Sequence, residues 1–90
     1  MTQVTRTVTI QNIQGLHARP VMRFVDLASH YECQVHIKKG DLLVDAKNPM
    51  EMMLLEATKG TVLELVAEGP DADPALDALV ELVNSRFGED

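Results

Sequence analysis

The stretch Gly15-Leu16-His17-Ala18-Arg19-Pro20 is followed by an apolar run with helical spacing, made up of Val21, Phe24, Val25 and Ala28. Proline is favoured in the first turn of a helix, because its missing N–H has no intrahelical partner to lose there. The free N–H groups of Ala18 and Arg19 then point out of the helix start, where the helix dipole adds partial positive charge. We therefore expect a helix from about Ala18 to Ser29, with His17 at its mouth and an anion-binding position beside it.

Histidine and arginine two residues apart suggest a chemistry for this helix start. Neutral imidazole is a nucleophile near neutral pH, since the unperturbed pKa of histidine is about 6.5. His17 can therefore carry a phosphoryl group, and the Arg19 guanidinium can offset the charge on its oxygens. A lone histidine near a helix start is more often a cap or a surface residue. The phosphoryl-carrying interpretation thus depends on the whole six-residue string.

The composition describes a small acidic chain. Its 90 residues leave room for one core, so we expect a single domain over residues 1–90. The net charge of -6 disfavours nucleic acid and anionic membranes as partners, because both are bound by clustered Lys and Arg. Cys33 is the single cysteine, which excludes an intrachain disulfide and fits a cytoplasmic location. We see neither a signal peptide nor an apolar run of transmembrane length.

The sequence gives no sign of a cofactor or a metal. No Walker loop is present, so we do not expect the chain to bind ATP on its own. The three histidines and one cysteine lack the spacing of metal ligands. His30 and His36 are expected to be solvated, and Cys33 to be a small core residue. A solvated face and a frayed tail account for the remaining carboxylates, which are Asp71, Asp73, Asp77, Glu89 and Asp90.

Two periodicities divide the chain into elements. Alternation of apolar and polar residues predicts strands at 4–11, 31–38, 42–46 and 61–68. Helical spacing predicts helices at 18–29, at 49–58 and from Asp73-Pro74 onward, the last with the apolar stripe Leu76, Leu79, Val80, Val83 and Phe87. Three amphipathic helices and one aliphatic sheet face indicate an open-faced α/β sandwich with its helices on one side. A ferredoxin-like or small-ligand regulatory domain would give a similar pattern, and periodicity does not fix the strand order.

The second predicted helix has a start signal at each of its first positions. Asn48 can cap the helix, and Pro49 fits its first turn. Glu51 is expected to bond back to the N–H of the cap residue. We expect Gly60 to form a left-handed cap at the other end of this helix.

A hairpin is predicted between the second and third strands. Lys39-Gly40-Asp41 forms its turn, because glycine readily supplies the positive φ that such turns need. Leu42, Val44 and Ala46 are expected to face the core. Leu43 is then left on the open face of the sheet.

The six-residue string resembles the active-site signature of HPr, the histidine-containing phosphocarrier of the bacterial phosphoenolpyruvate-dependent phosphotransferase system (PTS). The resemblance covers essentially the whole chain. It includes the order of the elements and the segments Lys39-Gly40, Lys59-Gly60-Thr61 and Ala67-Glu68-Gly69. The resemblance implies an α+β fold, βαββαβα, with a four-stranded antiparallel sheet and three helices on one face.

The same resemblance implies a function. His17 would take a phosphoryl group from Enzyme I and pass it to an EIIA domain of a sugar permease. Arg19 and the backbone N–H groups of Ala18 and Arg19 would hold the phosphoryl oxygens. Such a chain is a phosphotransfer intermediate rather than a free-standing enzyme.

Two departures from the family pattern bear on regulation and partners. Many family members carry a regulatory serine at the start of the second helix, where this chain has Asn48, which has no hydroxyl to phosphorylate. We therefore expect that regulation to be absent. Asp26, Ser29 and Glu51 stand where some members have lysines. We therefore expect the partners of this chain to be charged differently and cross-species transfer to be slow.

A partner surface is expected around His17. The residues that the resemblance suggests for it are Leu16, Pro20, Met50, Met53 and Leu54. Loose core packing is the competing interpretation of the methionines, because Met serves both purposes. We expect the chain to be a monomer.

Three functions remain open from the sequence. The first is a phosphocarrier for sugar uptake, and the second is a regulatory phosphocarrier of the nitrogen-type PTS with no transport step. The third is an interaction module that transfers nothing. The presence of both His17 and Arg19 argues against the third, whereas nothing in the sequence separates the first two.

Overall fold

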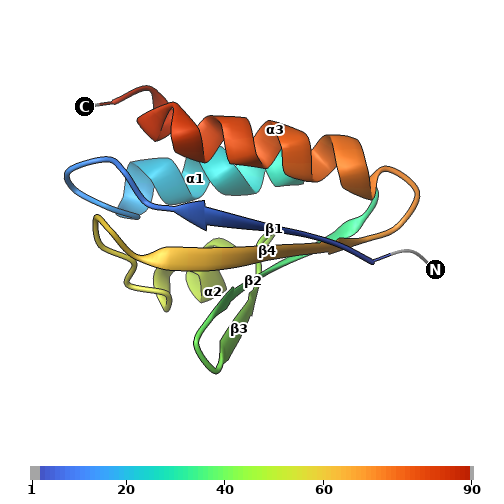
Figure 1. Cartoon of the computed structure of the whole chain (residues 1–90), viewed down its shortest axis with the longest axis horizontal. Coiled ribbons are helices and arrows are strands. Elements are labelled where there is room, and N and C mark those ends of the chain that lie inside the picture. Colours follow the sequence, from blue (N-terminus) through green and yellow to red (C-terminus); the bar gives the residue numbers. More distant parts are fainter. Residues whose placement is uncertain (1–2, 90) are drawn as a thin grey trace.

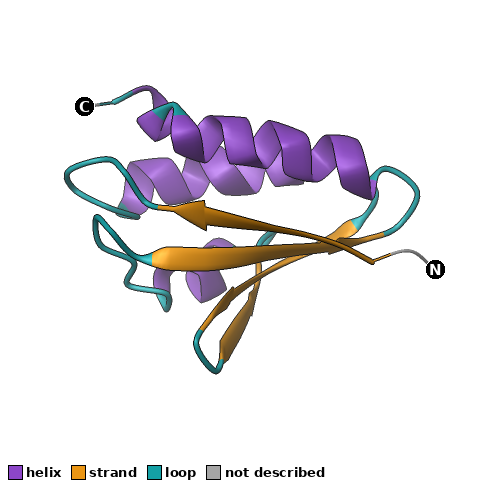
Figure 2. Ribbon diagram, in the orientation of Figure 1, coloured by secondary structure: helices purple, strands orange, loops and turns teal. Residues whose placement is uncertain are grey.

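A computed structural model describes residues 3–89 of the chain. Its elements are β1 (Gln3–Thr9), α1 (Ala18–Ala28), β2 (Gln34–Lys39), β3 (Leu42–Asp45), α2 (Pro49–Met53), β4 (Val62–Glu68), α3 (Ala72–Asn84) and a short 3-10 turn, η1 (Arg86–Gly88). The order of strands and long helices along the chain is the predicted one (Figures 1 and 2).

The four strands form one antiparallel sheet in the order β1-β4-β2-β3. The last strand in the chain therefore lies inside the sheet, between the first two. Its pairing with β1 runs from Thr9 opposite Val62 to Gln3 opposite Glu68. This arrangement confirms the expected α+β fold and supplies the strand order that periodicity leaves open.

The core lies between the sheet and the helices. Alternate residues of the strands point inward and are buried. These residues are Val8, Val35, Ile37, Val44, Leu63, Leu65 and Ala67. Figure 1 shows α1 and α3 side by side over the sheet and running in opposite directions. The two long helices each bury one stripe, which is Val21, Phe24, Val25 and Ala28 in α1 and Ala75, Leu76, Leu79 and Val83 in α3. The short helix α2 buries Met52.

The second helix is shorter than predicted. It ends at Met53, and the N–H of Leu55 donates to Met52 O at 3.2 Å, so the chain tightens before it leaves the helix. Glu56 then has a positive φ of 46°. Gly60, expected to cap this helix, instead donates its N–H to Ile10 O at 2.8 Å and leads into β4.

The start of α2 follows the predicted pattern at two of three positions. Asn48 caps the helix, since its Oδ1 accepts from the N–H groups of Met50 (3.0 Å) and Glu51 (3.2 Å). The side chain of Glu51 does not reach the N–H of Asn48. It accepts from the N–H of Asp45 instead (3.0 Å) and so ties α2 to the end of β3.

The prediction that Leu42 faces the core is wrong, because its side chain is 39% exposed. Figure 1 shows the turn between β2 and β3 projecting away from α1 and α3, so neither of these two helices covers the start of β3. Val44 and Ala46 are buried as expected, and Leu43 is exposed on the open face.

Candidate functional site

His17 is the residue that precedes α1, and its backbone is extended. Two contacts fix the chain just before it: the N–H of Leu16 donates to Ala57 O at 2.8 Å, and the N–H of His17 donates to Gly15 O at 3.0 Å. The carbonyl of His17 accepts from Val21 N–H at 3.1 Å and so starts the helix. The histidine therefore sits at the helix mouth, as the sequence indicates.

A carboxylate from the other end of the chain meets this histidine. Glu89 Oε1 lies 3.0 Å from His17 Nε2. The same oxygen accepts from Nδ2 of Asn12 at 2.9 Å, and that amide also donates to Gly15 O at 2.7 Å. The hydrogen bond from His17 is the main cause that lowers the pKa of Glu89, with further help from Asn12 and from the charge of Arg19.

The turn η1 delivers Glu89 to the site. Phe87 is buried in the core, and its carbonyl accepts from Nη1 of Arg23 on α1 at 2.7 Å. Arg86, Phe87 and Gly88 all have positive φ angles, which turn the chain sharply after α3. Figure 1 shows that α3 ends at the same end of the molecule as the loop before α1.

An open hollow of about 620 Å³ lies beside His17. It is lined by Ile13, Gln14, His17, Ala18, Arg19 and Glu89. The first N–H groups of a helix have no intrahelical acceptor, so those of Ala18 and Arg19 are available to oxygens in this hollow. Arg19 also lines the hollow, and free helix N–H groups beside a guanidinium are a combination that can bind a small anion.

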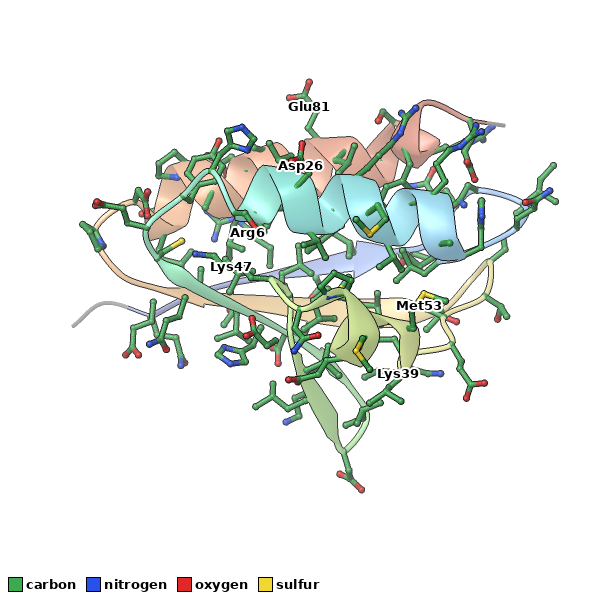
Figure 3. All side chains as sticks on the ribbon, turned by 180° about the vertical axis from the view of Figure 1, so that it is seen from behind. Arg6, Asp26, Lys39, Lys47, Met53 and Glu81 are labelled. Atoms are coloured by element: carbon green, nitrogen blue, oxygen red, sulfur yellow. The ribbon has the colours of Figure 1, made fainter. Side chains whose placement is uncertain are left out.

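The expected partner residues divide into two groups. Leu16 and Pro20 are buried, so in this structure they support the loop from beneath rather than present a surface. Met50, Met53 and Leu54 are 81%, 45% and 61% exposed. Figure 3 labels Met53, the last residue of α2. These three do not pack loosely in the core, which was the competing interpretation.

Sequence reasoning missed two features of the site. The prediction of a solvated face or frayed tail is wrong for Glu89, because its side chain is partly buried against His17. Asn12, which the sequence does not mark as part of the site, is fully buried and donates to that carboxylate. The contact between Glu89 and His17 is not local, because the two residues are 72 positions apart in the sequence. Local periodicity and short motifs therefore do not predict it.

The other candidate residues lie elsewhere. Nδ1 of His30 contacts Asp26 O at 2.7 Å on the surface of α1, and His36 is on the open face of the sheet opposite Asp45. Cys33 is buried, as expected of a core residue, and burial raises the pKa of its thiol. Within residues 3–89, no three His, Cys, Asp or Glu residues gather closely enough to hold a metal ion. No helix in this range is long and apolar enough to span a membrane.

An open α+β sandwich with a histidine, an arginine and free helix amides around one hollow is the framework of a small histidine phosphocarrier. Residues 4–85 match the family described as "PTS HPr component phosphorylation site". The chain therefore belongs to the HPr family.

The similar proteins agree on this family and differ in branch. The chain is 49% identical over 83 residues to the phosphocarrier protein HPr of Pseudomonas aeruginosa, and the aligned residues make up 91% of this chain and 92% of that protein. It is 38% identical over 89 residues to the phosphocarrier protein NPr of Shewanella violacea, and the aligned residues make up 99% of this chain and 98% of that protein.

Solved structures show the same fold. The crystal structure of HPr-C-His from Thermoanaerobacter tengcongensis matches with a TM-score of 0.91 and 43% identity, over 100% of this chain and 99% of that one. A structure described as an HPr dimer from the same organism matches with a TM-score of 0.78 and 44% identity, over 99% and 100% of the two chains.

Proposed function

We propose that His17 accepts a phosphoryl group from phosphorylated Enzyme I of the PTS and passes it to an EIIA domain during sugar uptake. The observation that carries this proposal is the hollow beside His17, which Ala18 and Arg19 line at the start of α1. Membership of the HPr family supplies the chemical class of the cargo.

The transfer requires little of the protein besides alignment and charge. An imidazole nitrogen forms a bond to phosphorus, while the bond from phosphorus to the donor breaks and its electron pair leaves with the donor. The developing charge on the phosphoryl oxygens is offset by Arg19 and by the N–H groups of Ala18 and Arg19. Because the hollow is open, the donor and then the acceptor can approach the same face of His17.

The partner surface that we propose consists of the exposed apolar side chains of α2 and of Leu54, the residue that follows it. Met50, Met53 and Leu54 supply flexible apolar area, which suits two partners of different shape. Asp26 on α1 and Glu51 in α2 are acidic where some family members carry lysines, so we expect partners that are less acidic than those of such members. We further propose that the chain acts as a monomer in the cytoplasm.

Intact mass tests the acceptor role. The protein is mixed with phosphoenolpyruvate, Mg²⁺ and Enzyme I from the same organism, and wild type is compared with His17→Ala. We expect an acid-labile phosphoryl adduct on wild type and none on the variant. His30→Gln and His36→Gln are matched controls that remove the other histidines and should keep the adduct. An Enzyme I that phosphorylates itself but leaves wild type unmodified would support a non-transferring interaction module instead.

The nitrogen-type PTS is the second candidate function. It is favoured by the 38% identity to an NPr protein over nearly the whole chain. The two candidates differ in the acceptor, so the phosphorylated protein is offered a sugar-type and a nitrogen-type EIIA in parallel. Faster transfer to the sugar-type domain supports the first proposal, and faster transfer to the nitrogen-type domain replaces it with the second.

A further inference from the structure

Glu89 is the one ionised group that the structure brings within hydrogen-bond distance of the His17 ring among the residues it describes. A carboxylate has only acceptor sites, so the 3.0 Å contact requires that Nε2 of His17 carries the proton. The lowered pKa of Glu89 supports its ionised form. A neutral imidazole protonated on Nε2 has its free lone pair on Nδ1.

We propose that Glu89 is a positioning residue for phosphoryl transfer: its carboxylate holds the His17 ring in one orientation and in the Nε2–H form, and so presents Nδ1 to phosphorus. The inference rests on the proposed function of His17. Nδ1 then attacks with its lone pair, and the bond from phosphorus to the donor breaks. No proton has to leave the ring, because the proton on Nε2 stays shared with Glu89.

The carboxylate is itself held from two sides, which distinguishes it from an incidental surface contact. Asn12 donates to the same Oε1 atom at 2.9 Å from a fully buried position. On the other side the backbone before Glu89 is anchored by the buried Phe87 and by the hydrogen bond from Arg23.

The turn that carries Glu89 also holds strain. Arg86 and Phe87 have φ angles of 59° and 55°, in a region that non-glycine residues seldom adopt. Such conformations persist where surrounding contacts impose them, and they gather at functional sites. Here the imposed turn directs Glu89 toward His17 across the end of the molecule.

The proposal is tested first in the unphosphorylated protein. Long-range ¹H–¹⁵N correlation spectra of the imidazole at pH 8.5 report which nitrogen carries the proton. We expect the Nε2–H form in wild type and a measurable share of the Nδ1–H form in Glu89→Ala. Glu89→Gln keeps a carbonyl oxygen that can accept from Nε2–H, so it should retain the wild-type form.

The second readout is the rate of phosphorylation by Enzyme I under single-turnover conditions. Loss of a partner that orients a functional histidine costs 10- to 100-fold in metal sites, so we expect about a tenfold slower rate in Glu89→Ala. Glu89→Gln should recover most of it. Glu81→Ala is the matched control, because Glu81 lies on α3 and points away from the molecule (Figure 3).

The outcomes separate this inference from the proposed function. An unchanged protonation form and an unchanged rate in Glu89→Ala overturn the role of Glu89 and leave His17 as the acceptor. A wild type that takes no phosphoryl group overturns the proposed function, and the role of Glu89 in transfer falls with it. Equal loss of rate in Glu89→Ala and Glu81→Ala also contradicts the inference, since it points to a general effect of charge.

Discussion

Gly15 holds the loop before α1 against the segment that follows α2. Its φ is +68°, and a Cβ atom there would lie 2.4 Å from Ala57 O and 2.9 Å from Thr58 Cα. Gly15→Ala should therefore combine left-handed strain with a backbone clash and lower the free energy of unfolding by about 3 kcal/mol or more. Urea unfolding measures this loss.

Gly40 is the matched control for Gly15. Its φ is +59°, but no atom lies within 4 Å of the position of an added Cβ. Gly40→Ala should cost only the strain, about 1 kcal/mol. Equal losses for the two variants would show that the contact with Ala57 does not constrain the loop.

Individual residues also show where sequence reasoning ends. The position of His17 and Arg19 at the start of α1 is predictable because its signal is local: a proline followed by an apolar run with helical spacing. Glu89 carries no such mark, because its role depends on a turn that is set by a buried Phe87 and by Arg23 on another helix.

Among the elements, α2 depends most on its cap. The helix has five residues, too few for its own hydrogen bonds to stabilise it, and Asn48 satisfies two of its first N–H groups. Asn48→Ala should lower the free energy of unfolding by about 1 kcal/mol. Asn48→Ser should stay within a few tenths of a kcal/mol of wild type, because serine caps as well as asparagine. An Ala variant as stable as the Ser variant would mean that packing of Met52, not the cap, holds α2.

The length of α2 also shows how tertiary contacts override local pattern. Residues 54–58 continue a helical composition, yet Ala57 is needed as the acceptor for Leu16 N–H. Gly60 is likewise drawn to Ile10. The chain leaves the helix early in order to make these bonds, and no local signal announces partners more than 40 residues away.

At the scale of the whole molecule, Asp71 joins α3 to the approach to β2. Its carboxylate accepts from the N–H groups of Glu32 and Cys33, each at 2.8 Å, and the bond from Glu32 is the main cause that lowers the pKa of Asp71. A carboxyl group whose pKa is lower in the folded chain than in the unfolded chain stabilises the fold at pH values above the unfolded pKa, which is about 3.9. That contribution is lost as the pH falls through the folded pKa.

Comparison with Asp71→Asn isolates this contribution. Wild type should exceed the variant in free energy of unfolding most at pH 7, and the difference should shrink as the pH falls below about 4. Chemical unfolding at several pH values measures it. A difference that stays constant from pH 7 to pH 2.5 would show that the charge of Asp71 has no part in the contact.

The overall architecture was the most predictable part of the molecule. Alternation and helical spacing identified the four strands and three helices, because each element buries one face of its own. The strand order was not predictable from these periods, because β4 pairs with β1 and β2, which are distant from it in the sequence.

The central claim is that the phosphoryl group is carried on a nitrogen of His17. ³¹P spectra of uniformly ¹⁵N-labelled protein, phosphorylated by Enzyme I, test it directly through the one-bond coupling between phosphorus and nitrogen. We predict a phosphorus signal that is coupled to a ring nitrogen of His17 and is absent in His17→Ala. Phosphorus without coupling to nitrogen, or coupled to His30 or His36, would contradict the account.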